Sequence, residues 1–262
     1  MWRILLVFLM LMPLRVLAQG DLVSADLKPG WRMSNGEHMA GLRLTLAPGW
    51  KTYWRAPGDA GIPPVFDWAG STNVRSVRVH WPAPHVFYQS GMRSLGYKQG
   101  VTLPLRVTPI DPSRDVTLRL EVDLGVCSDV CVPRQLRTGA ALPAAATRVD
   151  PVIAAALADR PLSADQAGIG QVRCEVRPAR GGIELHARIP MDRPGAGVET
   201  VVETADPQVW ASQPEAVWTG GQLLVSSRLK HAGGGAFALD RKGLRFTVIS
   251  QGRAVDIRGC TG

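Results

Sequence analysis

The chain has 262 residues, of which 28 are glycine and 20 are proline, and its formal net charge is +8. So much glycine and proline argues against a long helical bundle or a coiled coil, and 45% hydrophobic with 20% charged residues excludes a chain that is disordered throughout. The positive charge is spread over both halves without a basic tract, which favours a solvated surface and predicts no nucleic-acid site.

The N-terminus has the features of a secretory signal peptide. Arg3 provides a basic start, an apolar run follows over residues 4–12, and small residues precede a cleavage position after Ala18. An uncleaved anchor is the alternative, but the apolar run is shorter than the roughly 20 residues that span a bilayer. We therefore expect residues 1–18 to be removed during export, which permits disulfides. The rest of the chain is expected to be soluble, without stable membrane insertion.

Alternating apolar and polar residues predict a first β domain over residues 19–145. The alternation is clearest from Val116 to Val126 and leads directly to Cys127. Turns rich in glycine and proline separate the strands, as in a β-sandwich. The expected strands cover 42–46, 74–79, 101–107 and 116–126. Trp50, Trp54 and Trp68 are expected to pack in the core.

The composition changes at an alanine-rich stretch, residues 140–146, which is typical of a linker. Within a linker over 146–169 we predict a short helix over 152–159, with Asp150 as its cap and Pro151 at its first position. Strand patterns then resume and predict a second, smaller β-sandwich-like domain over 170–262, so the expected fold class is all-β. Its expected strands cover 172–176, 183–189, 222–229, 244–249 and 254–257.

Cys127 and Cys131 lie four positions apart at the end of a predicted strand. A bond between them closes a ring too small to gain much loop-closure entropy. Three interpretations are open: a pair that exchanges with the thiols of partners, a plain structural bridge, or a metal site, for example for copper. For Asp129, which lies between them, three roles are open: it raises the pKa of a neighbouring thiol by repulsion, it accepts a proton, or it is simply solvated.

Cys174 and Cys260 are 86 positions apart, near the two ends of the second domain. A structural disulfide between them would remove about 4 to 5 kcal/mol of unfolded-state entropy in the loop-closure model. The alternative is that both are free or contact another chain.

Arg55 and Asp59 are expected to form an ion pair that fixes a loop. No phosphate-binding glycine loop, serine elbow or spaced histidine cluster is present in the sequence, so no cofactor or metal is expected.

Three blocks in the first domain share their order and residue types with a known family. The blocks are Gly49–Pro63, then Trp81–Pro84 with Phe87-Tyr88 and Leu95–Tyr97, then Val126–Pro133. Together they resemble the N-terminal (alpha) periplasmic domain of the thiol:disulfide interchange protein DsbD, and most of all the branch that includes the copper-tolerance protein ScsB.

The resemblance implies an immunoglobulin-like sandwich in the periplasm that bears a redox-active cysteine pair. It assigns Cys131 to the mixed disulfide with partners and Cys127 to its resolution, and it assigns Phe87 and Tyr88 to a cap loop over the pair. Members of the family pass electrons from a membrane thiol-electron transporter to periplasmic thioredoxin-like proteins. DsbD carries its own membrane and thioredoxin-like domains, which this sequence does not show, so we expect the reductant to act in trans.

Two functions follow from these patterns. The first is an exported protein thiol-disulfide oxidoreductase that uses Cys127 and Cys131. The second is a non-catalytic, disulfide-bonded binding module, for example in copper handling. His80 and His85, near the predicted cap, are expected at the surface.

Overall fold

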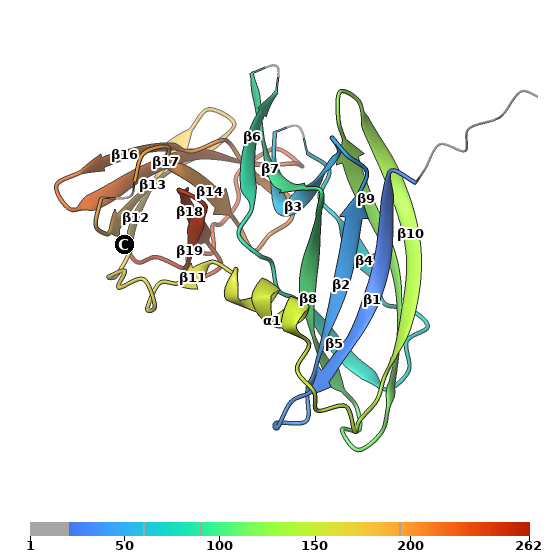
Figure 1. Ribbon diagram of the computed structural model, residues 1–262. Helices are drawn as coiled ribbons and strands as arrows, with labels where there is room; N and C mark the ends of the chain where they lie inside the picture. Colours follow the sequence, from blue (N-terminus) through green and yellow to red (C-terminus); the bar gives the residue numbers. More distant parts are fainter. Residues whose placement is uncertain (1–20, 60, 90, 194) are drawn as a thin grey trace, which may run out of the picture.

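The computed structural model describes residues 21–59, 61–89, 91–193 and 195–262, so the predicted signal peptide lies outside the described residues. Figure 1 shows two β-sandwiches, one from the N-terminal half of the chain and one from the C-terminal part, with a short helix between them. This architecture confirms the predicted all-β fold class. In the described part of the chain, no helix has the length and apolar character needed to cross a membrane.

The first sandwich packs two antiparallel sheets around one apolar core. One sheet has the order β1-β2-β8-β5, with bounds Val23–Arg32, His38–Leu46, Gly100–Pro109 and Val74–Val79. The other has the order β10-β9-β3-β7-β6, with bounds Cys131–Leu142, Val116–Cys127, Lys51–Gly58, Met92–Lys98 and His85–Gln89, and β4 (Val65–Asp67) also pairs with β9. Trp54 is fully buried, and Trp50 and Trp68 pack partly buried against the same core.

The strands β9 and β10 form one long hairpin, paired from Cys127 opposite Cys131 to Val116 opposite Leu142. In β9 the alternation of the sequence becomes alternation of burial, because successive side chains point to opposite faces. The alanine-rich stretch over 140–146, linker-like by composition, is not all linker, because residues 140–142 continue β10. The strand β10 lies at the edge of its sheet and is largely exposed. Its sequence therefore lacks the alternation of apolar and polar residues by which a strand is predicted.

The predicted helix is confirmed as α1 (Pro151–Ala158), with Asp150 as its cap. The Asp150 carboxylate accepts hydrogen bonds from the backbone amides of Val152 and Ile153, at 2.8 and 3.1 Å. Ile153 is fully buried against β2, where a Cβ on Gly41 would approach its Cγ1 to 2.8 Å. Glycine at position 41 therefore lets α1 dock on the first sandwich.

The second sandwich also packs two sheets around its own core. One sheet has the order β11-β19-β18-β14, with bounds Leu162–Ser163, Arg253–Arg258, Arg245–Ser250 and Glu199–Glu203. The other has the order β12-β13-β17-β15, with bounds Arg173–Ala179, Gly182–Pro190, Gln222–His231 and Val209–Ala211, and β16 (Glu215–Thr219) also pairs with β17. The short β11 lies inside the expected linker and pairs parallel with β19.

A disulfide joins Cys174 in β12 to Cys260, which follows β19. The two cysteines therefore connect the two sheets of the second sandwich, and both are buried in its core. The bond ties the start of this sandwich to the end of the chain.

Arg55 connects the two sandwiches, and the expected ion pair with Asp59 is wrong. The guanidinium donates to both carboxylate oxygens of Glu203 in β14, at 3.0 and 2.9 Å. The Arg55 guanidinium stacks on the Trp54 ring, with Cζ 3.7 Å from the ring centre. This stacking directs the guanidinium toward β14 and away from Asp59. Beside this ion pair lies an apolar contact: three residues of the second sandwich belong to the core cluster of the first, namely Val201, Ile249 and Ala254.

Replacing both Cys174 and Cys260 by alanine is expected to lower the free energy of unfolding of the second sandwich by about 4 kcal/mol, because the bond closes a long loop in the unfolded chain. Denaturant unfolding, with hydrogen exchange to locate the change, measures the effect. The matched control replaces Cys127 and Cys131, whose ring is far smaller, and should cost much less. An equal loss for both pairs would contradict the loop-closure explanation.

Candidate functional site

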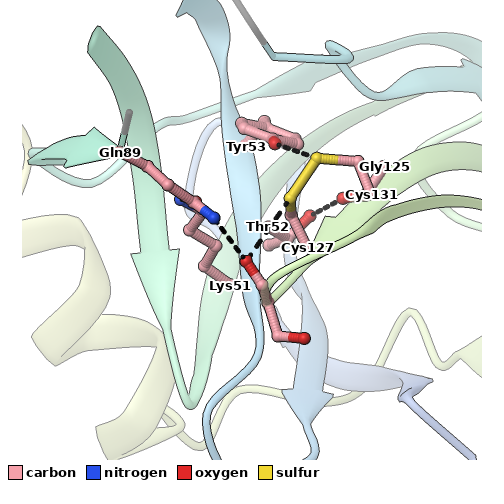
Figure 2. The surroundings of a disulfide bond; sticks show 8 residues. Lys51, Thr52, Tyr53, Gln89, Gly125, Cys127 and Cys131 are labelled. Carbon is pink, nitrogen blue, oxygen red and sulfur yellow. Dashed lines mark hydrogen bonds between the residues drawn. A yellow bond between two sulfur atoms is a disulfide. The ribbon is translucent and has the colours of Figure 1, made fainter. Parts of the chain in front are cut away.

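The cysteine pair sits where the long hairpin turns. Cys127 is the last residue of β9, Cys131 is the first residue of β10, and the two are register partners joined by a disulfide. Figure 2 shows the bond at the end of the hairpin, with residues of β3 and β6 around it. The turn between the cysteines consists of Ser128, Asp129 and Val130.

The two sulfur-bearing residues have opposite surroundings. Cys127 is 3% exposed, whereas Cys131 is exposed, as are Asp129 and Val130 beside it. A partner that approaches the turn therefore meets Cys131. The exposure of Asp129 fits the interpretation that its carboxylate is solvated.

Tyr53 in β3 contacts the exposed cysteine directly. Its Oη lies 3.2 Å from Cys131 Sγ, and the hydroxyl is the donor because a disulfide sulfur carries no hydrogen. Burial raises the pKa of Tyr53, so this hydroxyl stays protonated at neutral pH. The ring fits over Gly125, where a Cβ would lie 3.1 Å from Tyr53 Cε2, so the absent side chain makes room for it.

Two lysines share one face of the sheet with the cysteines. In cross-strand register, Lys98 of β7 lies opposite Lys51 of β3, Lys51 lies opposite Cys127, and Cys127 lies opposite Cys131. Directly opposite residues of antiparallel strands project their side chains to the same face. Burial and the charge of Lys98 lower the pKa of Lys51. The row therefore places positive charge on the Cys127 side of the disulfide.

The hairpin β6–β7 lies beside the cysteine turn, and its contact to that turn is made by Gln89. Gln89 Nε2 donates to the Ser128 carbonyl oxygen at 3.0 Å, and Gln89 Oε1 accepts from Lys51 Nζ at 2.8 Å. Figure 2 shows this chain of contacts from Lys51 through Gln89. Sequence reasoning missed both Gln89 and Tyr53, because neither belongs to a spacing pattern, although Tyr53 falls inside the first family block.

The predicted cap residues occupy β6 with their side chains in different directions. The Phe87 ring lies beneath both lysines, with Lys98 Nζ at 5.0 Å and Lys51 Nζ at 5.4 Å from its centre. Tyr88 is 62% exposed and donates a hydrogen bond to Glu199 of the second sandwich. The structure thus places Phe87 near the row that contains Cys127 and turns Tyr88 toward the other domain.

The histidines near this hairpin differ from each other. His85 is exposed, as expected, whereas His80 is half-buried. Burial, followed by the charge of Arg160, lowers the pKa of His80 to about 4, so it is neutral at physiological pH.

Among the residues that the structure describes, no three His, Cys, Asp or Glu side chains lie together as a metal site would require.

Comparison with known proteins supplies the context of this site. No curated protein matches the chain. Among solved structures, the crystal structure of the N-terminal periplasmic domain of ScsB from Proteus mirabilis is similar to it, with a TM-score of 0.65 and 23% sequence identity over 92% of each chain. This likeness shows that the fold of both sandwiches is shared.

A family described as "Thiol:disulfide interchange protein DsbD, N-terminal" matches residues 21–143. The match begins just before β1 and ends just after β10, so it spans the first sandwich and includes both Cys127 and Cys131. Residues 21–143 of this chain therefore belong to the family of DsbD N-terminal domains.

Proposed function

We propose that this protein is an exported thiol-disulfide exchange protein of the periplasm. Its Cys127–Cys131 pair passes two electrons between a membrane thiol-electron transporter and thioredoxin-like proteins. The observation that carries the proposal is the asymmetry of the pair: one cysteine is exposed beside a hydroxyl donor and the other is buried. Membership of the first sandwich in the DsbD N-terminal family supports the same reaction class. The signal-like residues 1–18 support export.

The reaction begins when a thiolate of the partner attacks Cys131 Sγ. The Cys127–Cys131 bond breaks, its electron pair moves to Cys127 Sγ, and that sulfur becomes a thiolate that takes up a proton. A mixed disulfide now joins Cys131 to the partner. The second thiol of the partner then attacks the partner's own sulfur and releases Cys131, so that the partner is oxidised and the pair is reduced. The same steps in reverse deliver the electrons to a second partner.

Neighbouring groups stabilise the sulfur that leaves in each step. The positive charge of Lys51 and Lys98 favours the thiolate of Cys127, which leaves in the first step. The Tyr53 hydroxyl favours the thiolate of Cys131, which leaves in the second. Since a lower pKa makes a better leaving group, each residue lowers the barrier of the step in which its cysteine departs.

Trapping of the mixed disulfide tests the proposal. Cys127→Ala leaves Cys131 without its resolving partner, so it should accumulate a mixed disulfide with a thioredoxin-like protein that keeps only its attacking cysteine. Non-reducing electrophoresis and mass spectrometry of the joined peptides measure the product. The matched control, Cys131→Ala, keeps only the buried cysteine and should give at least about tenfold less product. Equal trapping by both variants would refute the assignment of Cys131.

A redox titration separates the two disulfides. We expect the Cys127–Cys131 bond to be reduced at a potential above about −300 mV and the Cys174–Cys260 bond below it, because exposed bonds exchange readily while buried structural bonds resist the glutathione pool. Differential alkylation followed by mass spectrometry assigns each thiol. If the first bond resists reduction as strongly as the second, the exchange function is wrong.

Substitution of Tyr53 tests the role of its hydroxyl. Tyr53→Phe removes a donor to Cys131 Sγ and is expected to raise the pKa of the Cys131 thiol, because a hydrogen bond to the charged form favours that form. The rate of alkylation against pH, measured on reduced Cys127→Ala protein, gives this pKa with and without the substitution. An unchanged profile would show that the hydroxyl has no electrostatic role.

A further inference from the structure

A cavity of about 680 Å³ lies at the interface between the two sandwiches, and its walls are rich in arginine, so we call it the arginine cavity. Its volume is in the range of small-molecule sites. Figure 1 shows α1 and the segment after it between the sandwiches. The arginines come from three parts of the chain: the first sandwich provides Arg55 and Arg78, the segment after α1 provides Arg160, and the second sandwich provides Arg245 and Arg258.

Two of these arginines are paired with carboxylates that hold them in place. Arg55 donates to both oxygens of Glu203, and Arg245 donates to both oxygens of Asp256, at 2.6 and 2.7 Å. The side chains of Arg55 and Arg245 are 12% and 24% exposed. These two pairs therefore form a fixed and mostly buried part of the cavity wall that carries no net charge.

The other three arginines give the cavity an excess of positive charge. Arg258 lies 3.8 Å from Asp256, but both oxygens of this carboxylate already accept from Arg245. In the part of the chain that the structure describes, neither Arg78 nor Arg160 has a carboxylate oxygen within 4.0 Å. The charge of these guanidinium groups is therefore available to an anion.

Arg160 is held at the cavity by its neighbours. Its Nε donates to the carbonyl oxygen of Leu157 in the last turn of α1 at 2.8 Å, and carbonyls at a helix C-terminus attract a cation. Its Nη1 lies 3.5 Å from His80 Nδ1, which accepts because a guanidinium has only donors. His80 is neutral, so it adds no charge to the cavity. The position of Arg160 is thus set before any anion binds.

We propose that the arginine cavity binds a small oxyanion of the phosphate class, which Arg78, Arg160 and Arg258 hold between the two sandwiches. A phosphate group carries nearly two negative charges at neutral pH and three strong acceptor oxygens. It therefore offsets most of the excess charge and accepts from guanidinium groups on several sides, whereas a carboxylate has one charge and two oxygens. This binding goes beyond the proposed exchange function, since none of these arginines belongs to the cysteine site.

Titration calorimetry of the intact protein tests the binding. The probes are inorganic phosphate and glycerol 3-phosphate, added to a chloride buffer at constant ionic strength. Tighter binding of the ester would show that the cavity also accommodates an organic part. Equal or tighter binding of free phosphate would show that the phosphate group alone is recognised. Absence of binding by both probes would overturn the proposal.

Substitution of single arginines locates the site. Arg78 and Arg258 are exposed, so their replacement by alanine should leave the fold intact. Arg78→Ala and Arg258→Ala are each expected to weaken phosphate binding by at least about tenfold, because each loses a charge-assisted hydrogen bond. A loss in only one of the two variants would contradict a site that is shared between the sandwiches.

The matched control is Arg253→Ala. Arg253 belongs to the same strand as Arg258, β19, and is also exposed, but it does not line the cavity. The variant loses the same charge and should bind phosphate as the unaltered protein does. Weakening equal to that of Arg258→Ala would overturn the proposal, since it would show a general effect of net charge.

Thermal unfolding gives a second measurement. An anion that binds only the docked sandwiches stabilises the native protein by mass action, so phosphate at a hundredfold excess over its Kd should raise Tm by about 5 °C. Phosphate also stabilises proteins by exclusion from their surface, and Arg258→Ala retains that effect. The variant should therefore lose about half of the rise that binding causes. An equal rise of Tm in both proteins would contradict a bound anion.

Discussion

The site depends on the pairing of β9 with β10. This pairing places Cys127 and Cys131 opposite each other on the two sides of the turn of a long hairpin. Three turn residues separate the two bonded cysteines. Twelve register pairs behind the turn hold the two strands in place. The geometry of the disulfide is therefore supplied by the sandwich as a whole, whereas the small ring contributes little loop-closure entropy. Removal of this bond is therefore expected to cost the first sandwich little stability.

The surroundings of the pair make its two sulfurs unequal. β3 lies against the end of β9 and brings Tyr53 to the exposed sulfur, while the cross-strand row brings Lys51 to the buried one. Both effects come from one strand, since Lys51 and Tyr53 are two positions apart and therefore share a face. A single strand thus places a neutral donor at the exposed sulfur and a cation opposite the buried cysteine.

One strand of the second sandwich, β14, carries two ion pairs to the first. Glu199 and Glu203 lie at the two ends of β14 and each binds an arginine of the first sandwich, Arg93 and Arg55 respectively. Between them Val201 packs into the core of the first sandwich. An apolar contact flanked by two partly buried ion pairs fixes the direction of approach as well as the contact itself, because each ion pair requires its own geometry. The β6–β7 hairpin, through Arg93, is thereby linked to the second sandwich.

The sequence by itself determined the all-β class, the strands with strict alternation such as β9, the capped helix α1 and the division of the cysteines into a close and a distant pair. These features are local, since alternation, capping and spacing act over a few residues. It did not predict β10, β6 or β7. The strand β10 is a largely exposed edge strand, and the sequences of β6 and β7, HVFYQ and MRSLGYK, do not alternate regularly between apolar and polar residues. Tertiary structure alone decided that Tyr53, Gln89 and Lys51 surround the disulfide and that Arg55 pairs with Glu203 rather than Asp59. Those contacts join residues that are distant in the chain. They could not be predicted, because the partner of a side chain depends on which strands lie next to each other in the folded protein.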